Sequence, residues 1–389
     1  MRNIFLHTLA QTSDSPLSLE ITRAEGCWLF GHGEKKWLDF ISGIAVSSMG
    51  HSSPEIVKAV QEQAGKFMHT MVYGEHIQSP QILFAKKLIE VLGPGFEQVF
   101  FVNSGSEAVE GALKLAKKFT RRTKIFSFEN SYHGATHGAL TVTGTPWLKE
   151  GYGPFLPDVF HLKFNSFEDL EKIDFETACV IIEPIQAEAG VCLPADGFLA
   201  ALRKKCTATG TLLIFDEIQT GLGRTGSLFA FQKYEVKPDI ILLAKALGGG
   251  MPIGAFITRK DIMQVLSHDP PLGHITTFGG HPVSCAAGLA ALVKLLRDDL
   301  IYRVRESEFF IRQNLKHPAI KRISGAGLLF AVQLESKEKV KKTVWRGIDL
   351  GITMDWFLNA EDCIRLAPPL IISEAELSLG IEMLKKALD

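Results

Sequence analysis

Short apolar runs alternate with amphipathic segments along the middle of the chain. From their length and their β-branched or aromatic content, strands are predicted at residues 98–102, 124–128, 178–182, 211–215, 240–243 and 253–257. Between them, residues 107–119 and 197–207 carry apolar side chains at helical spacing. Strands that alternate with helices predict an α/β fold, in which a mostly parallel sheet is covered on both faces.

The two ends of the chain have a different pattern. Residues 28–30 and 37–40 flank a glycine-bearing turn and predict a β-hairpin. Shorter elements follow a long predicted helix at 283–299: strands at 320–323 and 328–334, and helices at 337–350 and 373–388. We therefore expect a large domain at 51–299 and a small α+β domain built from 1–50 and 300–389.

The composition excludes several classes of protein. The 389 residues are 46% hydrophobic and 22% charged, and their formal net charge of −1 gives no reason to expect a nucleic acid or an anionic membrane as partner. The N-terminus lacks a signal peptide's charged head and apolar core, and prolines and glycines interrupt the uncharged stretch 270–293. The six cysteines have no spacing typical of metal ligands or disulfides. We expect a cytoplasmic protein without a metal site.

Two of the predicted strands end on charged residues. Asp216 follows the strand at 211–215, and Lys245 follows the strand at 240–243 after one alanine. If these strands are parallel neighbours, both side chains emerge at the carboxyl edge of the sheet, where open α/β sheets bind ligands. A buried carboxylate there needs a cation or a strong donor, and a protonated ring nitrogen or a structural arginine would each serve.

Lys245 is the sharper signal of the two. It stands between an apolar strand and the glycine run 248–250, where no solvated surface lysine is needed. Burial lowers the pKa of a lysine and so favours the neutral amine that attacks carbonyl groups. A lysine that extends its ammonium group from the strand end to solvent is the less favoured alternative.

Two weaker signals fall on the same edge of the sheet. Gly105 and Ser106 lie where a strand leads into a helix, and free amides at a helix start favour a phosphate. An ordinary N-cap at Ser104 explains the same residues. Tyr132 follows the strand at 124–128 and could stack on a flat cofactor or simply pack against its neighbours.

Seven motifs in register indicate a known family. Their order, NSGSEA, SYHG, EPIQAEAG, FDEIQTGLGRTG, AKALGGGMPIG, TTFGGHP and IRLAPP, resembles the class-III (ω-amino) pyridoxal-phosphate aminotransferases, and most of all their acetylornithine/ornithine branch. The resemblance extends from Trp37 to Pro369. It implies the fold-type-I architecture, with a mainly parallel seven-stranded sheet in a large domain and a small domain from both termini. It also implies a homodimer with active sites at the subunit interface.

The resemblance assigns two catalytic residues and a set of cofactor contacts. Lys245 would be linked covalently to pyridoxal phosphate and would move the proton, and Asp216 would pair with the ring nitrogen. The remaining cofactor contacts would be the phenolic oxygen with Gln219, the ring with Tyr132, and the phosphate with the amides of Gly105 and Ser106 and with Thr277 of the second subunit.

The resemblance also assigns the substrate contacts. Arg365 would grip a substrate carboxylate by two hydrogen bonds, and Glu188 would cover this arginine when an ω-amine is the donor. Thr276 would lie near the substrate. The implied reaction moves an amino group from an ornithine-like donor, acetylornithine or ornithine, to 2-oxoglutarate by a ping-pong mechanism.

One departure from the family pattern leaves the donor open. Ala135 stands where the acetylornithine/ornithine branch has an arginine that recognises a second carboxylate. Other departures are Val109, Ala187 and His281; His281 or His137 could replace the missing donor. Lys149 and Arg224 are further candidate cations, although Arg224 belongs to a loop motif of the family.

Three alternatives to the assigned function remain. The pocket could favour a less charged amine, as in transaminases of the 4-aminobutyrate, lysine or amine:pyruvate type. An aminomutase, decarboxylase or epimerase could use the same lysine and aspartate. A non-catalytic binding protein is disfavoured because both residues are present.

Overall fold

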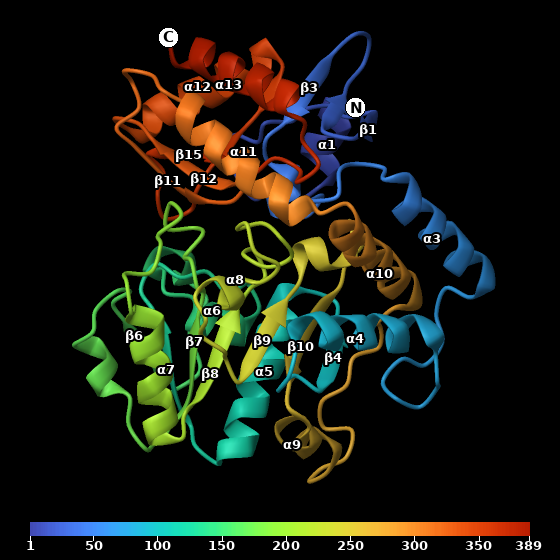
Figure 1. Ribbon diagram of the computed structural model, residues 1–389, viewed down its shortest axis with the longest axis vertical. Coiled ribbons are helices and arrows are strands. Elements are labelled where there is room, and N and C mark those ends of the chain that lie inside the picture. Colours follow the sequence, from blue (N-terminus) through green and yellow to red (C-terminus); the bar gives the residue numbers. More distant parts are fainter.

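The computed structural model describes residues 1–389 and is organised around a seven-stranded sheet (Figure 1). The strand order is β4-β10-β9-β8-β7-β5-β6. In that order the strands are Gln98–Val102, Gly254–Thr258, Ile240–Leu243, Leu212–Asp216, Thr177–Ile182, Lys124–Phe128 and Val159–Leu162. The predicted α/β fold with a seven-stranded sheet is confirmed.

Strand β10 is antiparallel to both of its neighbours, whereas β9, β8, β7, β5 and β6 pair in parallel. Only residues 244–253 join β9 to β10, and they contain no crossover helix of the length that a parallel return needs. Gly254 at the start of β10 approaches the neighbouring strand end so closely that a Cβ atom there would lie 2.2 Å from the carbonyl oxygen of Ser104. The short connection from β9 to β10 therefore stays close to the carboxyl end of β9 and lies against the residues that follow β4.

Alternate residues of the central strands belong to two separate hydrophobic clusters. Ile181 and Ile214 pack in one cluster with helix α5 (Gly105–Thr120), and Ile182 and Phe215 pack in the other with helix α7 (Phe198–Thr209). A strand that is buried on both faces has a continuous apolar sequence, and this is why these strands could be predicted from the sequence. The remaining helices of this part are α3 (Pro54–Lys66), α4 (Ser79–Leu92), α6 (His137–Val142), α8 (Ala230–Lys233), α9 (Lys260–Met263) and α10 (Pro282–Arg297).

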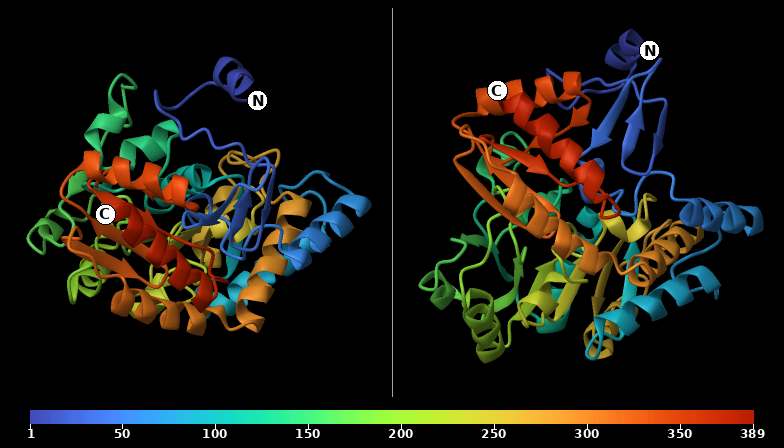
Figure 2. Two further views of the ribbon diagram at one scale, coloured as in Figure 1. Left: turned by 90° about the horizontal axis from the view of Figure 1, so that it is seen from above. Right: turned by 45° about the horizontal axis from the view of Figure 1, so that its top comes forward.

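Both termini contribute to the upper part of the molecule in Figure 1. One four-stranded sheet has the order β1-β2-β3-β13, so a strand from the C-terminal part completes an N-terminal sheet. Its strands are Arg23–Glu25, Trp28–Phe30, Lys36–Asp39 and Ile352–Thr353. Figure 2 shows these N-terminal strands beside helix α13 (Glu374–Leu388), where Trp28 Nε1 donates to Glu376 Oε1 at 2.9 Å. The domain boundaries at 50/51 and 299/300 stay predictions.

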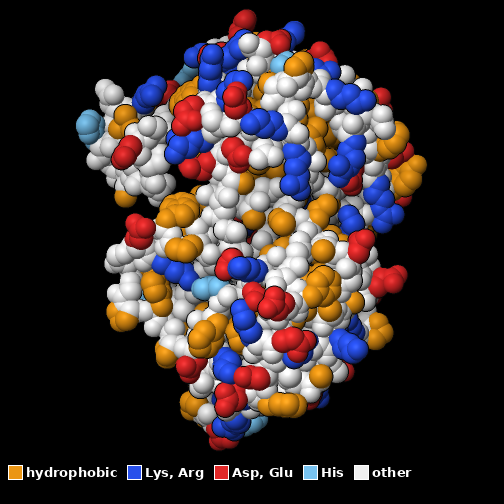
Figure 3. Space-filling model, turned by 90° about the vertical axis from the view of Figure 1, so that its left-hand side faces the viewer, with side chains coloured by type: hydrophobic (Ala, Val, Ile, Leu, Met, Phe, Trp, Pro, Cys, Tyr) orange, Lys and Arg blue, Asp and Glu red, His pale blue; other side chains and the backbone are white.

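A second four-stranded sheet, in the order β11-β12-β15-β14, lies in the C-terminal part. Its strands are Arg322–Ala326, Leu329–Gln333, Cys363–Leu366 and Asp355–Trp356. The other helices outside the large sheet are α1 (Arg2–Thr8), α2 (Ser42–Ala45), α11 (Leu300–Asn314) and α12 (Lys337–Leu350). No helix of the structure is both long enough and apolar enough to span a bilayer. Figure 3 shows acidic and basic side chains intermixed over one face.

Several elements were not predicted from the sequence, among them β6, β15 and α11. Strand β6 is a short edge strand inside a stretch interpreted as irregular, and β15 carries Arg365 within a segment given no secondary structure. The helix predicted at 283–299 ends at Arg297, and α11 begins at Leu300 because Asp299, with φ +47°, leaves the helical path. Edge strands and adjoining helices give weak periodic signals because they lack the long apolar run of a central strand.

Arg224 ties the loop after β8 to both terminal segments. Its guanidinium group is buried and donates to the carbonyl oxygens of Leu328 at 2.9 Å and Pro368 at 2.6 Å, and to Ser48 Oγ at 2.9 Å. The side chain therefore has a structural role, and it does not line the cavity described below.

Replacing Arg224 with methionine should lower the free energy of unfolding by about 3 kcal/mol, because buried acceptors would lose their donor. Urea-induced unfolding followed by circular dichroism measures this change. Arg322→Met is the matched control, because Arg322 is exposed. Equal unfolding midpoints for the two variants would contradict the structural role of Arg224.

Candidate functional site

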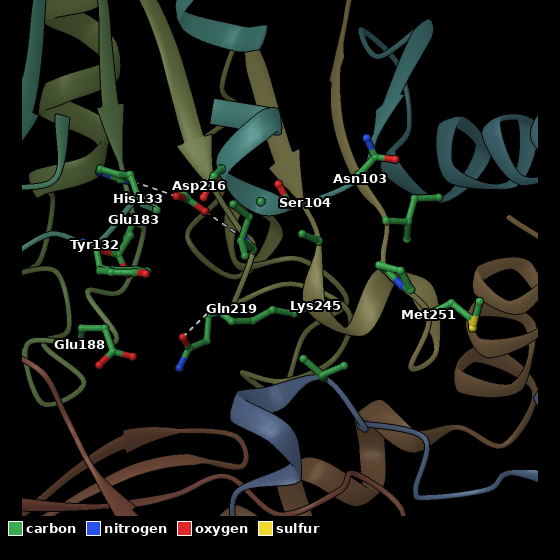
Figure 4. Close-up of a pocket in the computed structure, with 18 of the residues that line it drawn as sticks. Asn103, Ser104, Tyr132, His133, Glu183, Glu188, Asp216, Gln219, Lys245 and Met251 are labelled. Carbon is green, nitrogen blue, oxygen red and sulfur yellow. Dashed lines mark hydrogen bonds and ion pairs between the residues drawn. The ribbon is translucent and has the colours of Figure 1, made fainter. Parts of the chain in front are cut away.

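A cavity of about 400 Å³ lies at the carboxyl edge of the seven-stranded sheet (Figure 4). The loops that follow β4, β5, β7, β8 and β9 all contribute to its wall, as expected for a ligand site of an open α/β sheet. The charged or polar side chains that line it are Asn103, Ser104, Ser106, Tyr132, His133, Glu183, Glu188, Asp216, Gln219 and Lys245.

Asp216 is the last residue of β8, and its carboxylate is buried. Oδ2 accepts a hydrogen bond from His133 Nδ1 at 2.7 Å, and Oδ1 accepts one from the backbone N–H of Ile218 at 3.0 Å. The side chain of His133 is fully buried, and its Nε2 has no hydrogen-bond partner. The carboxylate is therefore held at two atoms and faces the cavity (Figure 4).

Lys245 opens a short 3-10 helix, Lys245–Gly248, directly after β9. Its backbone has φ +48°, a left-handed conformation that costs an L-residue on the order of 1 kcal/mol and that clusters at functional sites. The ammonium Nζ donates to Gln219 Oε1 at 3.0 Å, while Gln219 Nε2 is buried without a partner. Burial lowers the pKa of Lys245, although Glu188 and Asp216 oppose this shift.

The first turn of α5 has an N-cap and is also open to an anion. Ser104 is the N-cap, because its Oγ accepts from the backbone N–H of Glu107 at 3.1 Å. The amides of Gly105 and Ser106 precede the first helical hydrogen bonds and face the cavity without an acceptor. Gly134 lies so close that a Cβ atom there would be 2.2 Å from Ser106 Oγ. An anion can therefore reach the helix start.

Glu188 and Arg365 form a buried ion pair beside the cavity. Arg365 Nη2 donates to Glu188 Oε2 at 2.8 Å, and the backbone N–H of Leu358 donates to the same oxygen at 3.1 Å. Arg365 Nη1 is buried without a partner. Asp355 Oδ1 lies 3.4 Å from Arg365 Nε, and burial raises the pKa of Asp355 to about 6. The arginine is thus able to hold a carboxylate when Glu188 moves away.

The structure brings most of the predicted site residues together. Those that line the cavity are Gly105, Ser106, Tyr132, Glu188, Asp216, Gln219 and Lys245. Arg365 contacts it through Glu188, whereas Thr276 and Thr277 lie on the loop before α10 and do not line it.

None of the cations considered as replacements at Ala135 lines the cavity either. Lys149 donates to Thr141 O at 2.8 Å, and His137 Nε2 bonds Tyr152 O at 3.0 Å. Lys245 is therefore the one cation in the wall of this chain's cavity.

Two lining residues, Glu183 and His133, received no role from the sequence. Glu183 directly follows β7, and its carboxylate accepts from the backbone N–H groups of Tyr132 at 2.9 Å and Ala187 at 3.1 Å. Burial raises the pKa of Glu183 to about 7. The sequence did contain a clue to Glu183, because this residue follows an apolar strand in the same way that Asp216 ends one. For His133 the signal was its place next to Tyr132 in SYHG.

The family model described as Aminotransferase class-III matches residues 9–388. The chain belongs to this family. It is 38% identical to the acetylornithine aminotransferase of Aquifex aeolicus over 380 residues, which cover 96% of this chain and 97% of the relative. It is 37% identical to a succinylornithine transaminase of Salmonella paratyphi A, with 94% and 91% covered.

Solved structures of class-III aminotransferase relatives share the fold. Ornithine aminotransferase from Toxoplasma gondii ME49 has a TM-score of 0.91 at 31% identity, and the match covers 99% of this chain and 93% of that one. An (S)-enantioselective ω-transaminase from Thermomicrobium roseum has a TM-score of 0.90 at 31% identity, with 99% and 97% covered. The architecture is that of the fold-type-I enzymes, as the resemblance implied.

This class-III aminotransferase uses pyridoxal phosphate, as the family does. A second structure of the Toxoplasma enzyme holds the cofactor at partial occupancy in its active site. The cavity fits this group. The helix start of α5 has free amides for a dianion, Gln219 Nε2 lacks a partner, and a lysine and a buried carboxylate face the same space.

The cofactor-free protein should react with pyridoxal phosphate at Lys245. Because burial lowers the pKa of this lysine, its amine is uncharged to a greater extent at about pH 8 than the amine of a solvated lysine. Treatment with cofactor and then borohydride, followed by peptide mass spectrometry, should therefore label Lys245 ahead of the exposed Lys204. Comparable labelling of both residues would show that the site does not select Lys245.

Proposed function

We propose that this aminotransferase moves the amino group of an ornithine-like ω-amine donor to 2-oxoglutarate by a ping-pong mechanism. The observation that carries the proposal is the meeting of Lys245 and Asp216 in one cavity beside the Glu188–Arg365 ion pair. The acetylornithine aminotransferase and succinylornithine transaminase relatives support the donor class. Arg365 Nη1, which is buried without a hydrogen-bond partner, supports a second, carboxylate-bearing substrate.

The residues of the chain have distinct tasks in this proposal. When bound, pyridoxal phosphate supplies an electron sink that stabilises negative charge at the amine-bearing carbon of the substrate. Asp216, which His133 holds in place, would keep a proton on the ring nitrogen, and Gln219 would donate to the phenolic oxygen. Lys245 Nζ would take the proton from the amine-bearing carbon of the donor and pass it to the cofactor carbon bonded to the transferred nitrogen, and with the 2-oxo acid it would move a proton in the opposite direction. Tyr132 covers the ring.

Arg365 and Glu188 let one pocket accept two substrates. With the ω-amine donor, Glu188 stays on Arg365 and neutralises it. With the 2-oxo acid, Glu188 moves aside, and the substrate carboxylate takes the guanidinium hydrogen bonds that Glu188 leaves. Because one carboxylate replaces another, the positive charge of the buried guanidinium group stays paired, and this limits the free-energy cost of the exchange.

We also propose a cytoplasmic homodimer. Thr277 is exposed and lies outside the cavity of its own chain, which agrees with a contact to the phosphate in a second subunit, with Thr276 beside it. All six cysteines are free, as in proteins of a reducing compartment.

The decisive experiment supplies the amine donor alone. A ping-pong aminotransferase loaded with cofactor should release one equivalent of carbonyl product per subunit and then stop, until a 2-oxo acid is added. Quenched-flow product analysis measures this stoichiometry with ornithine, acetylornithine, succinylornithine, 4-aminobutyrate and lysine as donors. Carbonyl product that continues to form without an acceptor would point to a lyase, and continued release of carbon dioxide would point to a decarboxylase; either result would exclude transamination.

Ala135→Arg should improve the use of substrates with two carboxylates. Ala135 follows the cavity-lining Gly134, and no cation other than Lys245 lines the cavity of this chain. An added guanidinium group should lower the KM for 2-oxoglutarate by about tenfold. Ala135→Met, which adds length without charge, is the matched control. A higher KM in the arginine variant would show that the second carboxylate already has a partner. Preference for amines that carry no carboxylate would favour an amine:pyruvate type of transaminase.

A further inference from the structure

The carboxylate of Glu183 connects two segments that contribute to the same side of the cavity wall. One oxygen, Oε1, accepts from the backbone N–H of Tyr132 at 2.9 Å, and the other, Oε2, accepts from the backbone N–H of Ala187 at 3.1 Å. Only 6% of the residue is exposed. Tyr132 follows β5, whereas Ala187 precedes Glu188 in the loop after β7. Figure 4 shows Glu183 beside Tyr132, on the side of the cavity where Glu188 lies.

The two segments carry side chains with different tasks. Tyr132 and Glu188 both line the cavity, on the same side of it in Figure 4. Burial and the charge of Glu188 both raise the pKa of the Tyr132 phenol. Glu183 thus holds the backbone of Tyr132, whose ring would cover the cofactor. It also holds the backbone next to Glu188, whose carboxylate would cover Arg365.

We propose that Glu183 is a positioning residue that couples cofactor binding to substrate selection, by holding Tyr132 and the Ala187–Glu188 turn to one carboxylate. The proposal rests on the proposed function, because it takes the tasks of Tyr132 and Glu188 from there. Its physical basis is the pairing of two N–H donors with two carboxylate oxygens. A glutamine has one oxygen and can satisfy only one of these donors.

The chain contains a matched control for this arrangement. Glu217 is also buried, and its two oxygens accept from the backbone N–H groups of Ala230 at 2.5 Å and Phe231 at 2.7 Å. Burial raises the pKa of Glu217, like that of Glu183, to about 7. Unlike Glu183, Glu217 does not line the cavity. Glu183→Gln and Glu217→Gln therefore remove the same kind of bond at two places.

The experiment compares the wild type with these two variants at about pH 8, where both carboxyl groups are mainly ionised. Equilibrium titration gives the Kd for pyridoxal phosphate, steady-state kinetics gives the KM of donor and acceptor, and thermal unfolding gives the midpoint. We expect both variants to lose thermal stability to a similar extent. Only Glu183→Gln should raise the Kd for the cofactor, by about tenfold.

The ratio of the two KM values provides the second readout. A looser Glu188 competes less well for Arg365, so in Glu183→Gln the KM of the 2-oxo acid should fall relative to that of the amine donor. A uniform structural defect would leave this ratio unchanged. Glu183→Asp, which draws the carboxylate back from both donors, should change both readouts in the same direction and serves if the glutamine variant does not fold.

Two outcomes separate the possible failures. If Glu183→Gln and Glu217→Gln have the same Kd for the cofactor and the same KM ratio, Glu183 is a structural residue and the inference is wrong. If the wild type binds the cofactor but transfers no amino group, the proposed function fails instead.

Discussion

The site depends on the cost of burying charged side chains at one edge of a sheet. Asp216, Glu183, Glu188 and Arg365 are buried and Lys245 is partly buried, and an unpaired buried charge costs several kcal/mol. Each therefore has a fixed partner. Asp216 pairs with a histidine and Glu183 with backbone N–H groups, Glu188 and Arg365 pair with each other, and Lys245 pairs with the amide of Gln219. These partners determine where the side chains point, and they leave specific atoms, such as Gln219 Nε2 and Arg365 Nη1, without a bond. The unsatisfied atoms are where a cofactor and a substrate can bind.

The topology of the sheet places these charges together. Parallel strands β7, β8 and β9 end at the same edge, so the residues at or just after their ends meet there. The antiparallel return into β10 brings residues 250–253 back to the same cavity and requires glycine at Gly254. The left-handed backbone of Lys245 is part of this tight return. A class-III aminotransferase site thus follows from strand ends and one short connection.

The sequence predicted the central strands and the chemistry at their ends because long buried strands give continuous apolar runs and a charge after such a run stands out. Asp216 and Lys245 were found in this way. Arg365 was assigned only through the family resemblance, because its strand β15 is short and its partners come from loops distant in sequence. The positions of Glu183 after an apolar strand and of His133 next to Tyr132 marked both as candidates. Their tasks were missed because these depend on contacts with Tyr132, Ala187 and Asp216 that no spacing in the sequence reveals.

A crystal structure of the protein with pyridoxal phosphate tests the central claim most directly. The account predicts continuous electron density from Lys245 Nζ to the cofactor, with Asp216 within hydrogen-bond distance of the ring nitrogen. It also predicts the phosphate at the amides of Gly105 and Ser106 and the ring of Tyr132 over the cofactor. A cofactor bound through another lysine, or one whose ring nitrogen lies away from Asp216, would contradict it.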